Sequence, residues 1–528
     1  MSKSDSQALE QSHCRSSDQT CSGQDDLVSL GRCGLNSRVA EDFDKFKEEC
    51  GVMGLWGVPE ASNLAYLGIY ALQHRGQEGA GVVSLGRDGA GGAGVKLHTH
   101  KGLGLVSDVF QDVDFSKLPG QAAIGHVRYT TAGSNVLSNV QPFVASLSCG
   151  DVAVAHNGNL INADGLRAEL MGQGSIFSST SDTEIFLQLF ARNSKAKDRT
   201  EVVIKSLSRV VGAYSLVILF EDRLIAVRDP NGFRPLVMGA LGGGVVFASE
   251  TCAFDLIGAT LIREVEPGEV VEVTGEGVEH IKSYFPFKTT TPSPCVFEYI
   301  YFARPDSTVY GQNVYAVRER LGAQLAKECP VEADLVIPVP DSGVPAALGY
   351  AQAAGIPFGL GLIRNHYVGR TFIEPKQSIR DFGVKLKLNP NREMLEGKRI
   401  IVIDDSVVRG TTSRKIVDML RRAGAKEVHF RVSAPPSIAP CYYGIDTPSR
   451  SELVASSNSI DQIGKLLGAD SIGYLSLEGM YSAIGGEVGT KPETSSKPQR
   501  PTFCDACFSN RYPVGTPSDC ESEQGNLF

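Results

Sequence analysis

The chain has 528 residues, more than one hydrophobic core usually spans, so two or more domains are predicted. Its 42% apolar and 21% charged residues are typical of globular proteins, and its formal net charge of −9 argues against nucleic acid or an anionic membrane as the main partner. No apolar run reaches the about 20 residues of a membrane-spanning helix, and the first 49 residues carry several acids and no apolar leader segment, so a cytoplasmic location is expected.

Residues 1–49 are rich in Ser, Gln and acids and poor in aromatics, which predicts a disordered tail or pro-segment. The composition changes within "KFKEECGVMGLWG", residues 45–57, where Cys50 precedes an apolar, glycine-rich stretch. A lone cysteine beside a glycine is more often a buried structural thiol than a nucleophile. Cys50 therefore needs support from other segments before it can be given a role.

From residue 50 to about 284 the pattern mixes short apolar runs, many bounded by Gly, Asn or Asp, with stretches of helical periodicity. The predicted strands lie at 122–129, 151–158, 213–229, 243–249 and 268–273, and the predicted helices at 63–74 and 181–193. This mixture predicts an α+β layered domain over residues 50–284.

From 285 to 484 the pattern changes to strand–loop–helix units. Uninterrupted apolar strands are predicted at 334–339, 399–403 and 427–433, with helices at 346–355 and 413–424 between them. Such alternation predicts an α/β domain with a parallel sheet buried on both faces. Residues 485–528 read as a linker followed by a short cysteine-bearing tail.

The strongest local signal is "RIIVIDDSVVRGTTS", residues 399–413. A helix N-terminus binds phosphate, Gly410 allows close backbone approach, and the hydroxyl groups that follow are donors. Carboxylates repel phosphate, so Asp404 and Asp405 suggest sugar hydroxyls or a Mg²⁺ between protein and ligand. The plainer alternative is a solvated turn with ordinary Thr/Ser capping.

This segment resembles the phosphoribosyl pyrophosphate (PRPP) motif of type I phosphoribosyltransferases. The resemblance implies that Asp404 and Asp405 face the ribose hydroxyls and Mg²⁺, with Ser342 of "PVPDSGVP" (338–345) as a further metal or phosphate contact. The remaining implied PRPP-binding residues of the motif are Ser406, Val408, Arg409, Gly410, Thr411, Thr412 and Ser413. Residues 364–390 match the flexible loop that closes over PRPP in that family. Arg370, Lys385 and Lys387 of this loop are candidate pyrophosphate partners, although basic residues are as often simply solvated.

Four further segments bear on Cys50. They are "LQHRGQEGAG" (72–81) with Arg75, "GHVRYTTAGS" (125–134) with Arg128, "AHNGNLIN" (155–162) with Asn157 and Gly158, and "STSDTE" (179–184) with Asp182. An arginine, an aspartate and an Asn-Gly turn suit a zwitterionic amino acid and an oxyanion. Each segment alone is a weak signal, because an isolated Asn-Gly is usually only a turn.

In this order and spacing the segments resemble the class II glutamine amidotransferase domain, which has the N-terminal nucleophile αββα fold. The resemblance implies that Cys50 becomes the first residue of the mature chain, and that its own α-amino group serves as the base. Residues 1–49 are then a propeptide, cleaved between Glu49 and Cys50. Asn157 and the Gly158 N–H would stabilise the oxyanion. The implied glutamine-binding residues are Arg128 for the α-carboxylate, Asp182 for the α-amino group, and Arg75 as a further pocket residue.

The chain has twelve cysteines. In a large cytosolic chain, these are expected to be buried thiols, metal ligands or nucleophiles rather than a disulfide framework. "CDAC" (504–507) alone fits a redox pair, half of a zinc site or chance. The local contexts of Cys295, Cys441, Cys504 and Cys507 resemble those of the Fe–S-containing subgroup of amidophosphoribosyltransferases. This resemblance implies that the four cysteines hold one [4Fe–4S] cluster per subunit in a structural or oxygen-sensing role. Zinc in Cys₄ geometry is the competing metal.

Taken together, the motifs resemble the amidophosphoribosyltransferase family, specifically an Fe–S-containing, propeptide-bearing subgroup. The resemblance implies a transferase that converts glutamine, PRPP and water to 5-phosphoribosylamine, pyrophosphate and glutamate in purine biosynthesis. It also implies one Mg²⁺ per subunit, inhibition by purine nucleotides, and a homotetramer. Two alternatives remain open: a glucosamine-phosphate synthase, in which residues 399–413 would have no place, and a regulatory PRPP sensor, which would lack the glutaminase half.

Overall fold

The computed structural model describes residues 50–87, 94–129, 135–196, 198–275, 277–288, 290–366, 387–485 and 503–524. All of these belong to one compact unit of the chain, Asp42–Phe528. The predicted propeptide lies outside the described residues, as does most of the predicted PRPP loop with Arg370 and Lys385.

Two antiparallel sheets form from residues 51–284. The first has the strand order β11-β9-β10-β1-β4-β2-β3 and contains β1 (Gly51–Trp56), β2 (Gly79–Gly86), β3 (Lys96–Leu103), β4 (Ala122–Arg128), β9 (Val237–Leu241), β10 (Gly244–Ala248) and β11 (Thr260–Glu264). The second has the order β13-β12-β8-β7-β6-β5 and contains β5 (Phe143–Leu147), β6 (Gly150–Leu160), β7 (Gly212–Phe220), β8 (Leu224–Arg228), β12 (Val270–Val273) and β13 (Ile281–Tyr284). The run predicted as one strand at 213–229 is in fact the hairpin β7–β8, because polar residues 221–223 form its turn.

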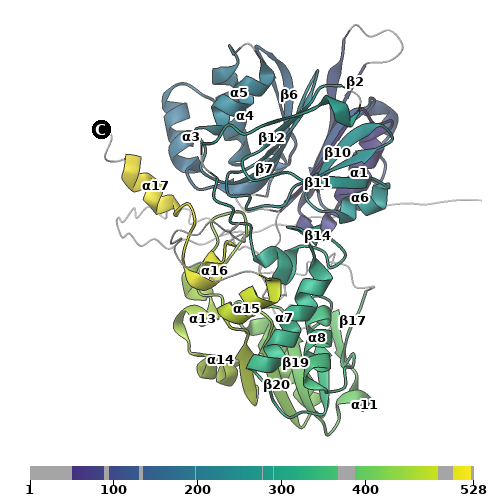
Figure 1. Cartoon of the computed structure of the whole chain (residues 1–528), viewed down its shortest axis with the longest axis vertical. Coiled ribbons are helices and arrows are strands. Elements are labelled where there is room, and N and C mark those ends of the chain that lie inside the picture. The colour runs from purple at the N-terminus through teal and green to yellow at the C-terminus, as the bar shows by residue number, and fades with distance from the viewer. Residues whose placement is uncertain are drawn as a thin grey trace, which may run out of the picture. The chain divides into compact units, whose positions relative to one another are not determined.

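The two sheets pack face to face, with helices on both outer faces (Figure 1). Side chains such as Val52 and Ile124 from the first sheet meet Val217 and Ala155 from the second in a buried layer. The first sheet is covered by α1 (Ala61–Ala71), α2 (Val106–Val109) and α6 (Cys252–Ile257), and the second by α3 (Ala163–Gly172), α4 (Thr183–Asn193) and α5 (Arg199–Leu207). This is the predicted αββα arrangement.

A four-stranded parallel sheet forms the core of the second half, in the order β16-β19-β20-β21. Its strands are β16 (Leu335–Pro338), β19 (Arg399–Asp404), β20 (Glu427–Val432) and β21 (Ser471–Tyr474). Ile401 and Ile403 face a cluster with α7 (Val314–Glu328), α8 (Val344–Ala354) and α15 (Leu477–Ile484). Ile400 and Val402 face the opposite cluster with α12 (Thr411–Arg422) and α14 (Ile460–Leu467). The predicted parallel sheet, buried on both faces, is confirmed.

Shorter elements complete the second half. They are β14 (Thr308–Val309), β15 (Gln312–Asn313), β17 (Leu362–Arg364), β18 (Leu388–Pro390), α11 (Arg392–Leu395), α13 (Val454–Ser457), α16 (Ala506–Ser509) and α17 (Pro517–Gln524). Strands β17 and β18 pair with each other, so the two ends of the predicted PRPP loop are held side by side. Across the described ranges, no helix combines the length and the apolar character needed to cross a membrane.

Candidate active sites

Cys50 lies immediately before β1, in the middle of the first sheet. Gly51 pairs with Val127, so Cys50 is level with Arg128 at the end of β4. The Cys50 side chain is buried, and its Sγ lies 3.5 Å from the carbonyl oxygen of Tyr129. Burial raises the pKa of the thiol to about 11, although Arg128 acts to lower it. With that pKa only about one thiol in 10⁴ is ionised at pH 7, so attack by Cys50 requires a base to take its proton.

Strand β6 carries Asn157 to the end of β4 where Cys50 and Arg128 lie. His126 on β4 donates from Nε2 to the carbonyl oxygen of His156 at 3.0 Å, which ties the two sheets together one residue before Asn157. The Asn157 side chain is fully buried, and neither polar atom of its amide has a hydrogen-bond partner among the described residues. Because such an atom costs free energy when left unsatisfied, a buried amide of this kind is typical of a group that binds a ligand.

Gly158 is part of the same strand, and Asp182 is held against it. Gly158 has φ of +143°, and a Cβ there would lie 2.1 Å from the carbonyl oxygen of Ala213, so only glycine fits. The Asp182 carboxylate accepts the Leu160 N–H at 3.0 Å and lies 3.7 Å from His156 Nδ1. Asp182 acts to raise the pKa of the Cys50 thiol, so its charge lies close to that thiol.

Arg128 and Asp182 thus supply one positive and one negative charge beside Cys50. Arg128 is buried and donates from Nη1 to the carbonyl oxygen of Asn139 at 2.8 Å. The pair is complementary to the α-carboxylate and α-amino group of an amino acid. The structure therefore brings together Cys50, Arg128, Asn157, Gly158 and Asp182 from four separate parts of the sequence.

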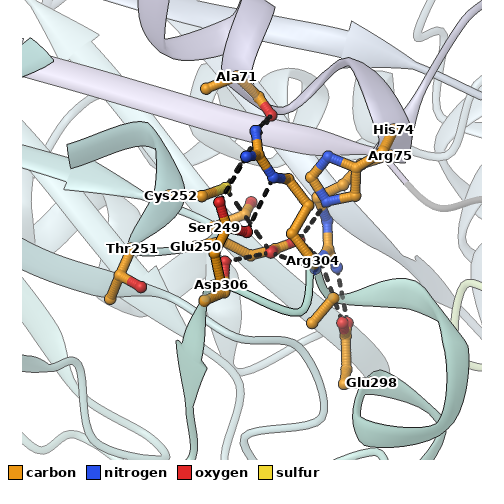
Figure 2. A network of polar contacts seen from close by, with 12 residues as sticks. Ala71, His74, Arg75, Ser249, Glu250, Thr251, Cys252, Glu298, Arg304 and Asp306 are labelled. Atoms are coloured by element: carbon orange, nitrogen blue, oxygen red, sulfur yellow. Dashed lines mark hydrogen bonds and ion pairs between the residues drawn. The ribbon is translucent and has the colours of Figure 1, made fainter. Parts of the chain in front are cut away.

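Arg75, predicted as a further residue of the glutamine pocket, is held by protein groups on two sides. Its Nε donates to the carbonyl oxygen of Cys50 at 3.3 Å, and its guanidinium is paired with the carboxylates of Glu250 and Glu298 (Figure 2). All of these side chains are fully buried. Arg75 therefore holds the backbone of Cys50, and its charge is matched by two carboxylates.

The second candidate site lies at the carboxyl edge of the parallel sheet. The Val339 N–H donates to the carbonyl oxygen of Ile403 at 2.8 Å, and a Cβ on Gly343 would lie 2.6 Å from that same oxygen. The loop that carries Ser342 therefore packs directly on the end of β19, where the two acidic residues follow. Parallel strands place their carboxyl ends at one edge, which is where ligands bind in such sheets.

Asp404 and Asp405 are both nearly inaccessible, with 1% exposure each. The Asp405 N–H donates to Asp404 Oδ1 at 3.0 Å, and Ser406 Oγ donates to Asp405 Oδ1 at 2.6 Å. Two buried carboxylates and a neighbouring hydroxyl are hard oxygen donors of the kind that Mg²⁺ prefers.

The loop after Asp405 ends at Gly410, which has φ of +82° and precedes α12. Gly410 has no side chain to cap the helix, so the N-terminal turn is not closed by the ordinary Thr/Ser capping that the plainer alternative required. Val408 is buried, and its carbonyl accepts the Val454 N–H at 2.9 Å, so only its backbone can contribute to a binding site. Arg409 is paired with Glu452 at 3.1 Å.

The remaining predicted residues of this motif lie along the first turn of α12. Thr411 begins the helix, and Thr412 and Ser413 are buried within it. Lys387, immediately before β18, is half-buried, and its carbonyl accepts the Asn365 N–H at 2.8 Å. The first turn and its glycine thus offer backbone N–H and hydroxyl groups of the kind that bind phosphate, a few residues after the two carboxylates.

The four predicted cluster cysteines also come together. The backbones of Cys295 and Cys504 pair in an isolated parallel β-bridge, in which the Val296 N–H donates to the Cys504 carbonyl oxygen at 3.1 Å. Burial first, and then the charges of Cys295 and Cys441, raise the pKa of the Cys504 thiol. The same causes, together with Cys504, raise that of Cys507. These four cysteines carry no disulfide. The tail is therefore docked on the core through the segment that contains "CDAC".

Within the described ranges, no three His, Cys, Asp or Glu side chains stand close enough together to hold a single metal ion. Zinc in Cys₄ geometry would need sulfurs about 3.8 Å apart, given Zn–S bonds of about 2.3 Å. The charges of Cys295 and Cys441 reach both Cys504 and Cys507, so the four thiols lie near one another, and four thiolates suit a [4Fe–4S] cluster or the competing Cys₄ zinc. Mg²⁺ is commonly held by one or two carboxylates together with substrate oxygens, so the Asp404–Asp405 pair fits it without a third protein carboxylate.

Sequence reasoning missed Glu250 and Glu298. Glu298 is the only charged residue in the apolar run "VFEYIYF" (296–302), and a charge in such a run requires a buried partner. That isolation was a usable signal. Nothing in the sequence named Arg75 as the partner, because the two positions are 223 residues apart.

Comparisons with known proteins agree with this arrangement. Residues 126–255 match the family described as glutamine amidotransferase domain, and residues 309–443 match the phosphoribosyl transferase domain. The chain is similar to amidophosphoribosyltransferase 1, chloroplastic, of Arabidopsis thaliana, with 54% identity over 92% of this chain and 82% of that protein. It is also similar to the amidophosphoribosyltransferase of Bacillus subtilis, with 50% identity over 88% of this chain and 94% of that protein.

Among solved structures, the chain is similar to glutamine PRPP amidotransferase from B. subtilis complexed with ADP and GMP, with a TM-score of 0.80 and 49% identity over 88% of this chain and 98% of that one. A second structure, described as the allosteric regulatory enzyme of purine biosynthesis, has the same TM-score of 0.80 and 49% identity over 89% of this chain and 99% of that one. Matches to both domains in one chain argue against a PRPP sensor without a glutaminase half, and against a sugar isomerase.

Proposed function

The chain belongs to the amidophosphoribosyltransferase family, whose reaction is the first step of purine biosynthesis, and we propose that it works through two sites, Cys50 and the 399–413 loop. Glutamine is hydrolysed at the first site. The ammonia released there reacts with PRPP at the second, giving 5-phosphoribosylamine and pyrophosphate. In the test, processed, anaerobically purified protein is mixed with glutamine, PRPP and Mg²⁺, and we expect PRPP-dependent release of glutamate. No release would contradict the proposal.

At the first site, the Cys50 sulfur attacks the side-chain amide carbon of glutamine while the α-amino group of Cys50 takes the thiol proton. Arg128 binds the α-carboxylate and Asp182 the α-amino group of the substrate. The Asn157 amide and the Gly158 N–H stabilise the oxyanion. Collapse of this intermediate expels ammonia, which carries away the transferred proton, and leaves a thioester. Water then hydrolyses the thioester to glutamate.

The observation that carries this assignment is the fully buried Asn157 amide without a hydrogen-bond partner among the described residues. Asn157→Ala is expected to lower kcat for glutamine hydrolysis by about 10²–10³-fold, because an oxyanion donor acts mainly in the transition state. The glutamine KM should change much less. Steady-state glutamate release measures both constants.

Asn193→Ala is the matched control for that variant. Asn193 ends α4 and donates to Ser206 Oγ at 2.9 Å, so its loss removes an asparagine hydrogen bond elsewhere in the same half. It should leave glutamine hydrolysis unchanged. If Asn157→Ala hydrolyses glutamine as fast as the wild type, Asn157 is not an oxyanion donor.

At the second site, the first turn of α12 and its hydroxyl groups hold the 5-phosphate, while Asp404 and Asp405 face the ribose hydroxyls. Asp404, Asp405 and Ser342 would hold a Mg²⁺, whose chemistry is to neutralise the leaving pyrophosphate. Arg370 and Lys385, outside the described residues, and Lys387 are further proposed pyrophosphate contacts. Ammonia attacks C1 of the ribose as pyrophosphate departs.

The two sites belong on one chain because ammonia in water is mostly protonated and is then not a nucleophile. Transfer within the protein delivers the neutral molecule, and a loop closed over PRPP keeps water from the reaction.

Processing between Glu49 and Cys50 is part of the same proposal. A thiol with a pKa of about 11 needs a base, and the α-amino group of Cys50 exists only after residues 1–49 are removed. N-terminal sequencing of active protein should therefore begin at Cys50. An active chain that still carries residues 1–49 would contradict this part of the proposal.

We propose that Cys295, Cys441, Cys504 and Cys507 hold one [4Fe–4S] cluster and that the chain belongs to the Fe–S-containing subgroup; the support is the mutual proximity of these thiols. Cys504→Ser is expected to lose the broad absorbance near about 400 nm of such a cluster, because one of four thiolate ligands is gone. Absorbance and iron content of anaerobically purified protein measure this loss. Cys520→Ser, in α17, is the matched tail control and should keep both signals. A colourless, iron-free wild type would contradict the cluster.

We also propose inhibition by purine nucleotides, a homotetramer and a cytoplasmic location. The first is supported by the ADP and GMP named for the B. subtilis structure. The homotetramer is tested by light scattering, which should give four times the mass of one chain. The third is tested with a tagged chain, against the chloroplast named for the plant relatives.

A further inference from the structure

A buried chain of four charged side chains lies beneath Cys50. Glu250, Arg75, Glu298 and Arg234 alternate in sign along it, and each has a side-chain exposure of 0%. Arg75 pairs with Glu250 and Glu298, and Arg234 Nη1 lies 3.4 Å from Glu298 Oε1. Two positive and two negative groups leave no net charge, which is how such groups are accommodated in an interior.

Arg75 connects this network to the nucleophile. Its Nε donates to the Cys50 carbonyl oxygen at 3.3 Å. The two carboxylate oxygens of Glu298 accept hydrogen bonds from Arg75, Oε2 from Nη1 at 3.1 Å and Oε1 from Nη2 at 2.6 Å (Figure 2). This two-point contact fixes the plane of the guanidinium. Because the guanidinium is planar and rigid, fixing that plane also fixes the direction of its Nε–H toward Cys50.

Glu298 belongs to the second half of the chain. It begins the π-helical turn η5 (Glu298–Phe302), which follows the predicted boundary at residue 285. This turn is itself anchored, since Arg318 of α7 donates from Nε to the Tyr299 carbonyl at 2.7 Å. Arg318 also donates from Nη2 to the Ala303 carbonyl at 2.8 Å. The carboxylate that orients Arg75 is therefore held by the phosphoribosyltransferase half.

The second half holds the other carboxylate as well. Glu250 Oε2 accepts the Arg304 N–H at 2.9 Å and the Ser307 hydroxyl at 2.7 Å. Figure 2 shows Glu250 between Arg75 and the segment that carries Arg304. Both carboxylates that grip Arg75 are thus part of the second half or bonded to it.

We propose that Glu298 is a positioning residue for the glutaminase reaction, acting through Arg75 on the backbone of Cys50. The inference rests on the proposed role of Cys50 as the nucleophile. In this arrangement the glutaminase site is incomplete without a carboxylate from the other half, although Glu298 does not touch glutamine.

The test compares Glu298→Gln with wild-type holoenzyme in three measurements. These are kcat and KM for glutamine hydrolysis, PRPP-dependent synthesis with ammonia in place of glutamine, and alkylation of Cys50 by the glutamine analogue 6-diazo-5-oxo-L-norleucine. We expect kcat and the alkylation rate to fall by about 10²-fold, as for a small misplacement of a reacting group. The glutamine KM should stay within about twofold, and ammonia-dependent synthesis should be unchanged.

Glu298→Asp keeps the charge and should recover part of the lost rate. Arg75→Lys, which cannot form the two-point contact, should behave like Glu298→Gln. Glu272→Gln is the matched control, because Glu272 is equally a buried carboxylate paired with an arginine, Arg223, but lies on β12 of the other sheet. It should match the wild type in all three measurements.

Three results would overturn the inference. One is equal loss of glutamine- and ammonia-dependent synthesis in Glu298→Gln, which would indicate general damage to the fold. Another is a raised glutamine KM at unchanged kcat, which would place Arg75 among the substrate contacts. The third is no change at all. Failure of the proposed function is distinguishable, because the analogue would then not react with Cys50 in the wild type either.

Discussion

Cys50→Ala is expected to abolish glutamine-dependent synthesis of 5-phosphoribosylamine, by a factor on the order of 10⁴ or more, while synthesis from added ammonia continues at close to the wild-type rate. The variant loses the sulfur that is proposed to attack glutamine, so no ammonia should be released at the first site. The second site, built on β19 and α12, keeps its residues and can use ammonia from solution. Pyrophosphate release, measured with each nitrogen source in turn, gives both rates.

Cys149→Ala is the matched control for this variant. Cys149 is half-buried in the turn between β5 and β6 of the same half, so the change removes a thiol of similar size without touching the β1 terminus. It should keep both activities. If Cys50→Ala retained glutamine-dependent synthesis, another group would have to be the nucleophile.

Asp404→Asn is expected to show the complementary pattern. Synthesis should fall by about 10³-fold with glutamine and with ammonia alike, because the variant loses a buried carboxylate that is proposed to face the ribose and Mg²⁺ at the second site. Hydrolysis of glutamine in the absence of PRPP should be unaffected. Removal of Mg²⁺ by a chelator should abolish synthesis by the wild type in the same way.

Asp334→Asn serves as the matched control on the same sheet. Asp334 precedes β16 and is paired with Arg399 at 2.9 Å, at the amino edge of the strands, opposite to Asp404. Its pKa is lowered to about 2 by that pairing, so the variant also loses a stabilised charge. It should synthesise normally. Normal ammonia-dependent synthesis by Asp404→Asn would contradict the PRPP assignment.

Local patterns in the sequence were sufficient to predict much of the fold. Apolar runs that alternate with helical stretches indicated the parallel sheet at 334–339, 399–403 and 427–433, because strands buried on both faces carry no polar alternation. The run at 213–229 was less informative. Its polar interruption at 221–223 is short, and only the antiparallel pairing of β7 with β8 shows it to be a turn.

In the candidate sites, too, some features could be predicted from local sequence and others depend on the tertiary structure. The PRPP motif is contiguous, so its carboxylates, glycine and helix start were all readable from one segment, Asp404 to Ser413. Asn157 and Asp182 were assigned because their segments, in this order and spacing, resemble the class II glutamine amidotransferase domain. Their burial, and the absence of described partners for the Asn157 amide, depend on the contact between β4 and β6.

The sequence by itself therefore determined the order of the two halves, because its motifs resemble a glutaminase domain first and a phosphoribosyltransferase domain second. Only the tertiary structure decided what Arg75 does. A basic residue in "LQHRGQ" suits a substrate carboxylate equally well, and its true partners, Glu250 and Glu298, lie 175 and 223 residues away. Charge pairing in an interior is set by which groups the packed sheets and helices bring within a few ångströms, and a linear pattern does not contain that distance.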